Sequence, residues 1–274
     1  MSESKTVLTK ILSHPYPFRY LLMRTVRDLK LGSYSFRASI GAVERPHYAH
    51  LVFNSARLAK RLGYDKISVI EYGVAGGKGL LALEHHASNV EKLLSIGIEV
   101  YGFDTAKGLP PPSDYRDLPY HWKQGFFAMD EKQLTSRLKK AKLVLGDIRE
   151  TAKSFFARYS PAPIGAIACD VDFYSSTVPM LEVLTVEEKY LMPRIFCYFD
   201  DTVGSEVELY NDFTGERLAI NEFNDVNPFI KICKPYYFST KRAEMWHEQI
   251  WVAHLFKHTR YNSFISEENQ TLTL

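Results

Sequence analysis

The chain has 274 residues, enough for one substantial hydrophobic core and close to the upper size of a single α/β domain. Its 34 basic and 32 acidic residues give a net charge of +2, which excludes a strong overall attraction to nucleic acid or to an anionic membrane. No apolar run approaches the roughly 18 residues that span a bilayer, and the N-terminus lacks the apolar segment of a signal peptide. We therefore expect a cytoplasmic protein with neither nucleic-acid nor membrane partners.

The first 64 residues predict a layer of helices. Two segments, 17–32 and 45–63, place apolar residues at intervals of three and four, and each ends on a glycine. The basic residues of the first segment are expected to form its solvated face, with a site for an anionic partner as the alternative. These residues are Arg19, Arg24, Arg27 and Lys30. We expect this layer either to cover the functional site or to form the interface of a homo-oligomer.

From residue 65 onward, predicted strands and helices alternate. The expected strands are 67–71, 99–104, 142–145, 164–170 and 194–200. The expected helices between them are 79–94, 130–140, 151–159 and 178–190. This order predicts βαβ units, and therefore a parallel sheet covered by helices on both faces, within one globular unit at residues 65–274.

The pattern changes after residue 217. Two apolar segments, 217–223 and 249–256, are predicted as strands without a crossover helix between them, which is typical of an antiparallel edge. The expected fold is therefore an α/β, Rossmann-like sheet that is mostly parallel with an antiparallel C-terminal edge. Cys169, Cys197 and Cys233 lie in apolar, strand-like segments without CxxC spacing, so we expect buried free thiols.

A glycine-rich loop follows the first predicted strand, in the sequence VIEYGVAGGKGL at residues 69–80. Such a loop lets the backbone approach a ligand beyond the carboxyl ends of the strands. The spacing of Gly73, Gly76 and Gly77 fits neither GxGxxG nor the P-loop motif. The strand ends on Glu71, whose carboxylate would repel a diphosphate and attract a cation. S-adenosylmethionine (SAM) carries a sulfonium and an ammonium group but no phosphate, so it fits this loop.

The next two strands are also followed by carboxylates. Asp104 ends the second strand, where a carboxylate can accept hydrogen bonds from both hydroxyls of a ribose. Asp147 follows the third strand, where the adenine amino group would lie; the alternative for Asp147 is a helix cap or turn residue. Three successive strand ends thus indicate a nucleoside-bearing ligand.

Four aspartates follow the fourth and fifth strands, namely Asp170, Asp172, Asp200 and Asp201. The carboxyl ends of neighbouring parallel strands meet at one edge of the sheet, so these carboxylates are expected to converge and to repel one another without a cation. Hard oxygen ligands suit Mg²⁺ or Ca²⁺, and a bound Mg²⁺ would lower the pKa of an acceptor hydroxyl beside the methyl donor. The alternative is that Asp172 and Asp201 cap helices or turns and face solvent.

Five segments in this order resemble the macrocin O-methyltransferase family, metal-dependent class I SAM methyltransferases that methylate sugar hydroxyls of macrolide antibiotics. They are IEYGVAGGKGL, VYGFDTAKGLPPP, VLGDIRET, DVDFYSST and YFDD, and they cover about half the chain, from residue 69 to residue 201. The most specific pieces are Asp104 with the GLPP that follows at 108–111, and the DxDxYxST run. The sequence departs from the family after Asp201, where Thr202 and Val203 replace a tyrosine-containing continuation.

The resemblance implies a class I methyltransferase fold, with SAM on Glu71, Gly73 and Asp104 and with Mg²⁺ as the metal. The implied metal ligands are Asp172, Asp200 and Asp201. Taking the loop and the strand ends together, we expect the cofactor-binding residues to be Glu71, Gly73, Gly76, Gly77, Asp104, Asp147 and Asp170.

His121 lies in a proline- and aromatic-rich segment after the second strand, where a lid over the site is expected. We expect His121 or Asp172 to accept the proton of the acceptor hydroxyl, with packing in the lid as the alternative for His121. The sequence thus predicts a SAM-dependent O-methyltransferase that uses Mg²⁺ and acts on a hydroxylated small molecule such as a sugar or natural product. A non-catalytic SAM-binding scaffold and a nicotinamide-dependent oxidoreductase are the alternatives.

Overall fold

The computed structural model describes residues 17–241 and 244–266, and these form a seven-stranded sheet with the order β3-β2-β1-β4-β5-β7-β6. The strands are β1 Lys66–Tyr72, β2 Gly97–Asp104, β3 Lys142–Leu145, β4 Ile164–Cys169, β5 Leu191–Phe199, β6 Ile230–Cys233 and β7 Ile250–Leu255. Strands β1 to β5 pair in parallel, whereas β7 is antiparallel to both β5 and β6. The predicted α/β class, with a mostly parallel sheet and an antiparallel C-terminal edge, is confirmed.

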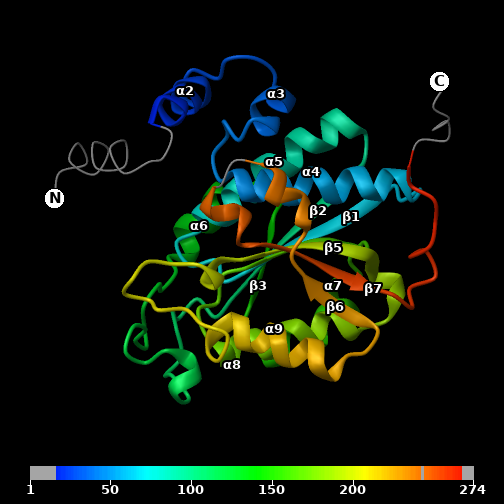
Figure 1. Ribbon diagram of the computed structural model, residues 1–274. Helices are drawn as coiled ribbons and strands as arrows, with labels where there is room; N and C mark the ends of the chain where they lie inside the picture. Colours follow the sequence, from blue (N-terminus) through cyan, green and yellow to red (C-terminus); the bar gives the residue numbers. More distant parts are fainter. Residues whose placement is uncertain (1–16, 242–243, 267–274) are drawn as a thin grey trace.

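Helices cover both faces of this sheet (Figure 1). One face carries α4 (Pro46–Arg61) and α5 (Lys78–Leu94), and the opposite face carries α7 (Ile148–Tyr159), α8 (Tyr174–Leu181) and α9 (Gly215–Val226). The central strands are therefore shielded from water on both sides; all six residues of β4 are buried. This explains the nearly continuous apolar sequence of the strands, since each buried Ile or Val side chain contributes about 1.5–3 kcal/mol.

The N-terminal helices differ in how closely they join the domain. Helix α4 packs directly on β4 and β5, because its residues Tyr48, Leu51 and Val52 recur at helical spacing and are buried. Helices α2 (Pro17–Asp28) and α3 (Tyr34–Ser39) lie outside α4 (Figure 1). The part of the expected helical layer before residue 17 lies outside the described residues. No described helix is both long and apolar enough to cross a bilayer.

The prediction of a strand at residues 217–223 is wrong, because these residues lie within α9. Glu216, Ala219 and Ile220 are buried and Phe223 is partly buried, at the three- and four-residue spacing of a helix. A short apolar run between polar residues does not distinguish the 3.6-residue period of a helix from the two-residue period of a strand. Helix α9 is therefore the crossover connection between β5 and β6, which was not expected from the sequence. Residues 250–255 form β7 as predicted.

Two smaller expectations also need correction. The helix predicted at 178–190 begins earlier, at Tyr174, and ends at Leu181; two 3₁₀ turns follow, and the extended backbone of Val186 (φ −72°, ψ 176°) separates them. Cys169 and Cys197 are buried free thiols as expected, but Cys233 is exposed because β6 is the edge strand of the sheet.

Candidate functional site

A cavity of about 900 Å³ opens beyond the carboxyl ends of the parallel strands. Ligands of doubly wound sheets bind at this edge, and the volume is at the upper end of the roughly 300–1,000 Å³ that small-molecule sites occupy. Seven predicted site residues line it: Gly73, Asp104, Asp147, Asp170, Asp172, Asp200 and Asp201. Glu71, Gly76, Gly77 and His121 do not line it.

The glycine loop between β1 and α5 forms one wall of the cavity. Gly73 has φ +83°, and a Cβ atom at this position would lie 1.6 Å from the carbonyl oxygen of Asp170. Only glycine therefore lets the ends of β1 and β4 approach so closely. Gly77 has φ +78° and faces the Leu134 side chain, whereas a Cβ atom on Gly76 would meet nothing within 4 Å. The close packing of the loop therefore requires glycine at Gly73 and Gly77 but not at Gly76.

This difference predicts contrasting effects of two alanine substitutions. Gly73→Ala is expected to lower the free energy of unfolding by about 2–3 kcal/mol, because the new methyl group overlaps backbone and the left-handed conformation is strained. Gly76→Ala is the matched control, since its site is open, and should change stability by less than about 0.5 kcal/mol. Chemical denaturation of the two variants measures this; equal stabilities would contradict the close approach at Gly73.

Asp104 lines the cavity and also braces the glycine loop. Its Oδ2 accepts hydrogen bonds from the backbone N–H groups of Val74 (2.9 Å) and Ala75 (2.8 Å), and its Oδ1 accepts one from Ala106 (2.6 Å). A carboxylate has about four acceptor positions, so capacity remains for a ligand hydroxyl. The residue predicted to bind ribose therefore fixes the loop beside it.

Glu71 lies behind the loop, away from the cavity wall. Its side chain is buried, Tyr48 Oη donates to Oε1 at 2.6 Å, and Oε2 has no hydrogen-bond partner among the described residues. Burial raises the pKa of Glu71 to about 8 against the opposing effects of the Tyr48 hydrogen bond and the Arg45 charge. A cation bound near the loop would favour the ionised form of this carboxyl group.

Asp147 caps a helix and also lines the cavity. It precedes α7 and caps it, because its Oδ1 accepts the backbone N–H of Arg149 at 2.9 Å. The Arg149 guanidinium also pairs with the Asp147 carboxylate, which lowers the pKa of Asp147. Both residues line the cavity, so the helix cap stands at its rim.

Three carboxylates that line the cavity converge. One oxygen from each of Asp170, Asp172 and Asp201 lies within 4.8 Å of the others, and Asp172 and Asp201 are buried. Burial is the largest cause that raises the pKa of all three, and repulsion by neighbouring carboxylates adds to it; the pKa of Asp201 rises to about 7. A divalent cation would offset both the burial of these charges and their mutual repulsion. This set of oxygen donors suits Mg²⁺.

Asp200 lies beside this group and is held by other partners. Its Oδ1 accepts hydrogen bonds from Tyr198 Oη and from Gln249 Nε2, the latter at 3.3 Å. The predicted metal set was Asp172, Asp200 and Asp201, whereas the carboxylates that converge are those of Asp170, Asp172 and Asp201.

Residues that the sequence analysis did not select hold the acidic group in place. Tyr210 Oη donates to Asp201 Oδ1 (2.6 Å), and the buried Glu216 accepts the backbone N–H of Asp201 through Oε2 (3.0 Å). The N–H of Asp172 donates to Asp201 Oδ2 (3.1 Å), with Asp172 in the left-handed region at φ +60°. The helical spacing of Glu216 within α9 was the signal that could have identified it.

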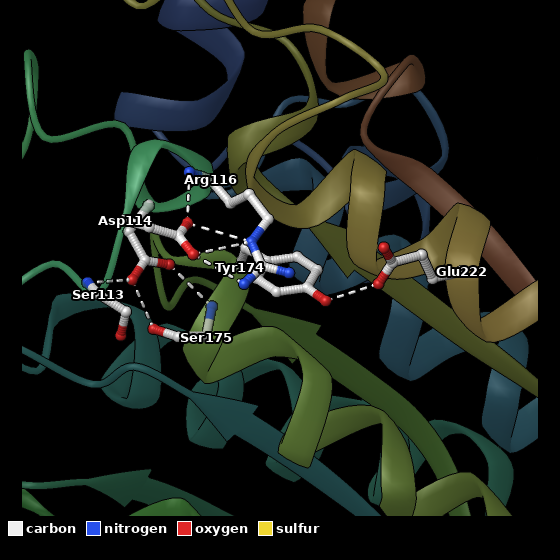
Figure 2. A network of polar contacts seen from close by, with 7 residues as sticks. Ser113, Asp114, Arg116, Tyr174, Ser175 and Glu222 are labelled. Atoms are coloured by element: carbon white, nitrogen blue, oxygen red, sulfur yellow. Dashed lines mark hydrogen bonds and ion pairs between the residues drawn. The ribbon is translucent and has the colours of Figure 1, made fainter.

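A polar network ties the proline-rich loop to α8 at the edge of the cavity (Figure 2). The buried Asp117 accepts the backbone N–H of Ser113 (2.8 Å) and both the N–H and the hydroxyl of Ser175 (2.8 Å each). Ser113 and Ser175 line the cavity. Tyr174 Oη donates to Glu222 on α9 at 2.6 Å, which joins α8 to the next helix. The cavity residues Ser113 and Ser175 are thus fixed by one buried carboxylate, and α8 is fixed to α9.

The lid segment contributes an aromatic residue next to the predicted histidine. His121 packs against Trp122, with ring centroids 4.2 Å apart, and it is Trp122 that lines the cavity. Tyr72, at the end of β1, also lines the cavity; its hydroxyl is buried and has no hydrogen-bond partner among the described residues. A hydroxyl in this position is available to hydrogen-bond a ligand.

No protein-family model matches the chain, and no curated protein matches it at the sequence level. Among solved structures, the chain is similar to CalS11, a calicheamicin methyltransferase, with 20% identity, a TM-score of 0.50, and coverage of 82% of this chain and 86% of that one. It is also similar to cofactor-bound Rv0187 from MTB (13% identity, 93% and 96% covered, TM-score 0.44). A third similar structure is an O-methyltransferase from Bacillus cereus in complex with SAH (12% identity, 85% of this chain and 96% of that one covered, TM-score 0.42). The likeness to CalS11 shows that the chain has the Rossmann-like class I methyltransferase fold.

Proposed function

We propose that the protein is a SAM-dependent O-methyltransferase that transfers a methyl group to a hydroxyl of a small molecule. The observation that carries this proposal is one cavity lined both by the glycine loop with Asp104 and by three convergent carboxylates. The loop side suits a nucleoside-bearing ligand, and the acidic side suits a cation beside it. A non-catalytic SAM-binding scaffold would need only the loop side, so that alternative gives the acidic group no role.

The loop side fits SAM. Gly73 and Ala75 bring backbone to the cavity wall, Asp104 would accept a hydrogen bond from a ribose hydroxyl, and Asp147 would meet the adenine amino group. The unpaired hydroxyl of Tyr72 offers a further donor to the ligand. SAM would supply the electrophilic methyl group, and these residues would orient it.

The acidic side fits Mg²⁺. Asp172 and Asp201 belong both to the predicted ligand set and to the convergent carboxylates, so we assign both to the metal. Asp170 and Asp200 are the two candidates for a third ligand. When bound, Mg²⁺ would polarise an acceptor hydroxyl and lower its pKa. Tyr210 fixes Asp201 by the hydrogen bond to Oδ1, so the carboxylate is oriented before any ligand arrives.

The acceptor would lie between the acidic group and the aromatic side of the cavity. Trp122, Phe127 and Tyr210 line this part and would pack against a sugar ring or another cyclic body. Asp172 is the candidate proton acceptor, because it lines the cavity whereas His121 does not. CalS11 is described as a calicheamicin methyltransferase, and we therefore take hydroxylated sugars and glycosylated natural products as the first acceptors to screen.

A calorimetric titration with SAM, repeated with Mg²⁺ and with EDTA, tests the proposal. Micromolar binding that is insensitive to EDTA is expected, because the loop residues and the metal ligands are separate sets. Transfer of a labelled methyl group to the screened acceptors should then require Mg²⁺. Absence of SAM binding under every condition would refute the cofactor assignment, and transfer that persists with excess chelator would refute the metal assignment.

A further inference from the structure

A second cavity, of about 860 Å³, lies between α2, α3 and α4 and the 3₁₀ turns at Tyr236–Thr240 and Met245–His247. None of its lining residues lines the first cavity. The two cavities are nevertheless bordered by adjacent residues of one segment. Met245 lines the first cavity, whereas its neighbours Glu244 and Trp246 line the second. The two cavities therefore share the turn at residues 245–247 as a wall.

Positive charge is concentrated in this second cavity. Its lining contains five permanent cations from three parts of the chain, namely Arg19, Arg24, Arg27, Arg57 and Lys241, and a single carboxylate, Glu244. The whole chain has a net charge of only +2, so this is a local accumulation. Lys30, the fourth basic residue of the first predicted helical segment, does not line the cavity, as expected for a solvated side chain.

The available carboxylates do not neutralise this charge. Arg24 and Arg27 share Asp28, at 3.5 Å and 2.8 Å, and Arg19 Nε lies 3.6 Å from Glu244 Oε1. Within the described ranges, Arg57 and Lys241 have no carboxylate partner. Two cations from different parts of the chain thus line one cavity without a carboxylate partner, and this charge favours the binding of an anionic ligand.

Polar nitrogens at the cavity also lack hydrogen bonds among the described residues. Arg19 Nε and His247 Nδ1 are buried and make no hydrogen bond within the described part of the chain. A buried polar atom without a hydrogen bond is unfavourable, and a ligand atom that bonds to it would remove this cost. Arg19 and His247 both line the cavity, so the atoms without hydrogen bonds lie beside the concentrated positive charge.

A chain of hydrogen bonds adds a further donor. Asn54 Nδ2 donates to the backbone carbonyl of His50 (2.8 Å) and to its Nδ1 (3.2 Å), so Nδ1 acts as an acceptor. The proton of the neutral ring then lies on Nε2, which donates to Tyr237 Oη at 2.7 Å. The hydroxyl proton of Tyr237 remains free to bond a ligand in the cavity that all three residues line.

Aromatic rings form the remaining wall. Phe53, Tyr237 and Trp246 line the cavity, and His50 lies 5.6 Å from the Trp246 ring centroid. Guanidinium groups recognise phosphate oxygens through paired hydrogen bonds, and aromatic faces stack on planar rings. Arginines, free donors and aromatic rings together match a ligand with a phosphate group and a planar ring.

We propose that the second cavity binds a phosphorylated small molecule with a planar ring, of the class of nucleoside phosphates. Its phosphate groups would lie among Arg19, Arg57 and Lys241, and its ring would lie against Tyr237 and Trp246.

Calorimetry with the full-length protein, its first cavity saturated with SAM, tests this site with three probes. UDP combines phosphate and ring, inorganic pyrophosphate offers phosphate alone, and uridine offers the ring alone. UDP is expected to bind at least about tenfold more tightly than pyrophosphate, and uridine should not bind detectably. The same titrations without SAM should give the same UDP affinity, so the result does not depend on methyl transfer.

A charge-matched pair of variants places the binding in this cavity. The double variant Arg57→Gln with Lys241→Gln should weaken UDP binding at least about tenfold, and both residues are exposed, so folding should be retained. The control, Lys92→Gln with Lys153→Gln, removes the same charge from exposed positions on α5 and α7 and should leave UDP binding within about twofold.

Three results would overturn the proposal. The first is the absence of UDP binding at millimolar concentration in the unmodified protein. The second is equal weakening by the two double variants, which would indicate a general effect of net charge. The third is loss of UDP binding when SAM is added, which would place UDP in the first cavity.

Discussion

Replacing Asp201 with Asn is expected to lower the rate of methyl transfer at least about 10³-fold and to change SAM affinity less than about threefold. Asn keeps the size of the side chain and an oxygen for the Tyr210 hydrogen bond, but it loses the acceptor for the Asp172 N–H and removes one negative charge from the metal site. The loop residues that would hold SAM are untouched. Methyl transfer at saturating SAM and Mg²⁺, together with a SAM titration, measures both effects.

Unfolding would not explain such a loss. Asp201 is buried among like charges, so removing its charge relieves repulsion in the metal-free protein. This relief offsets the lost hydrogen bond from the Asp172 N–H, so the thermal midpoint of Asp201→Asn in EDTA should stay close to that of the unmodified protein. A variant that keeps full Mg²⁺-dependent activity would contradict the assignment of Asp201 to the metal.

The same assay distinguishes the two candidates for the third metal ligand. If Asp170 is the ligand, as its convergence with Asp172 and Asp201 favours, Asp170→Asn should raise the Mg²⁺ concentration for half-maximal activity far more than Asp200→Asn. Asp200 accepts hydrogen bonds from Tyr198 and Gln249, so in this case it would support the site without binding the metal. The reverse order would restore the set implied by the family resemblance.

The second large effect is expected from Glu71→Gln and depends on pH. Burial raises the pKa of Glu71 from an ordinary value of 4.5 to about 8, so the folded state holds a proton that the unfolded state has lost between these values. Stability is therefore full below pH 4.5 and falls as the pH rises towards 8. At about 1.36 kcal/mol for each pH unit, the loss is of the order of 5 kcal/mol.

Gln cannot ionise, so Glu71→Gln should be free of this loss. The two proteins should have similar stabilities near pH 5, and the variant should be more stable by a few kcal/mol near pH 9. Denaturation from pH 5 to pH 9 measures the difference between the two proteins, which cancels the titration of the aspartates. A difference that does not vary with pH would mean that Glu71 ionises normally.

The sequence was sufficient for the parts of the fold that depend on local pattern. Apolar strands and amphipathic helices alternate from residue 66 to residue 199, and this order alone places strand ends and their carboxylates at one edge. Helix α9 was missed because its short apolar run fits both periods, and Glu216 was missed with it.

The sequence by itself determined that a glycine loop and a series of aspartates meet at the carboxyl edge of a parallel sheet, because parallel strands must end there together. Only the tertiary structure decided which carboxylates converge, and that Glu71 lies behind the loop while Asp104 braces it. It also decided that arginines of α2 share a cavity with Lys241, far away in the chain. Such contacts depend on how distant elements pack and on which hydrogen bonds orient each side chain, and neither is encoded in local spacing.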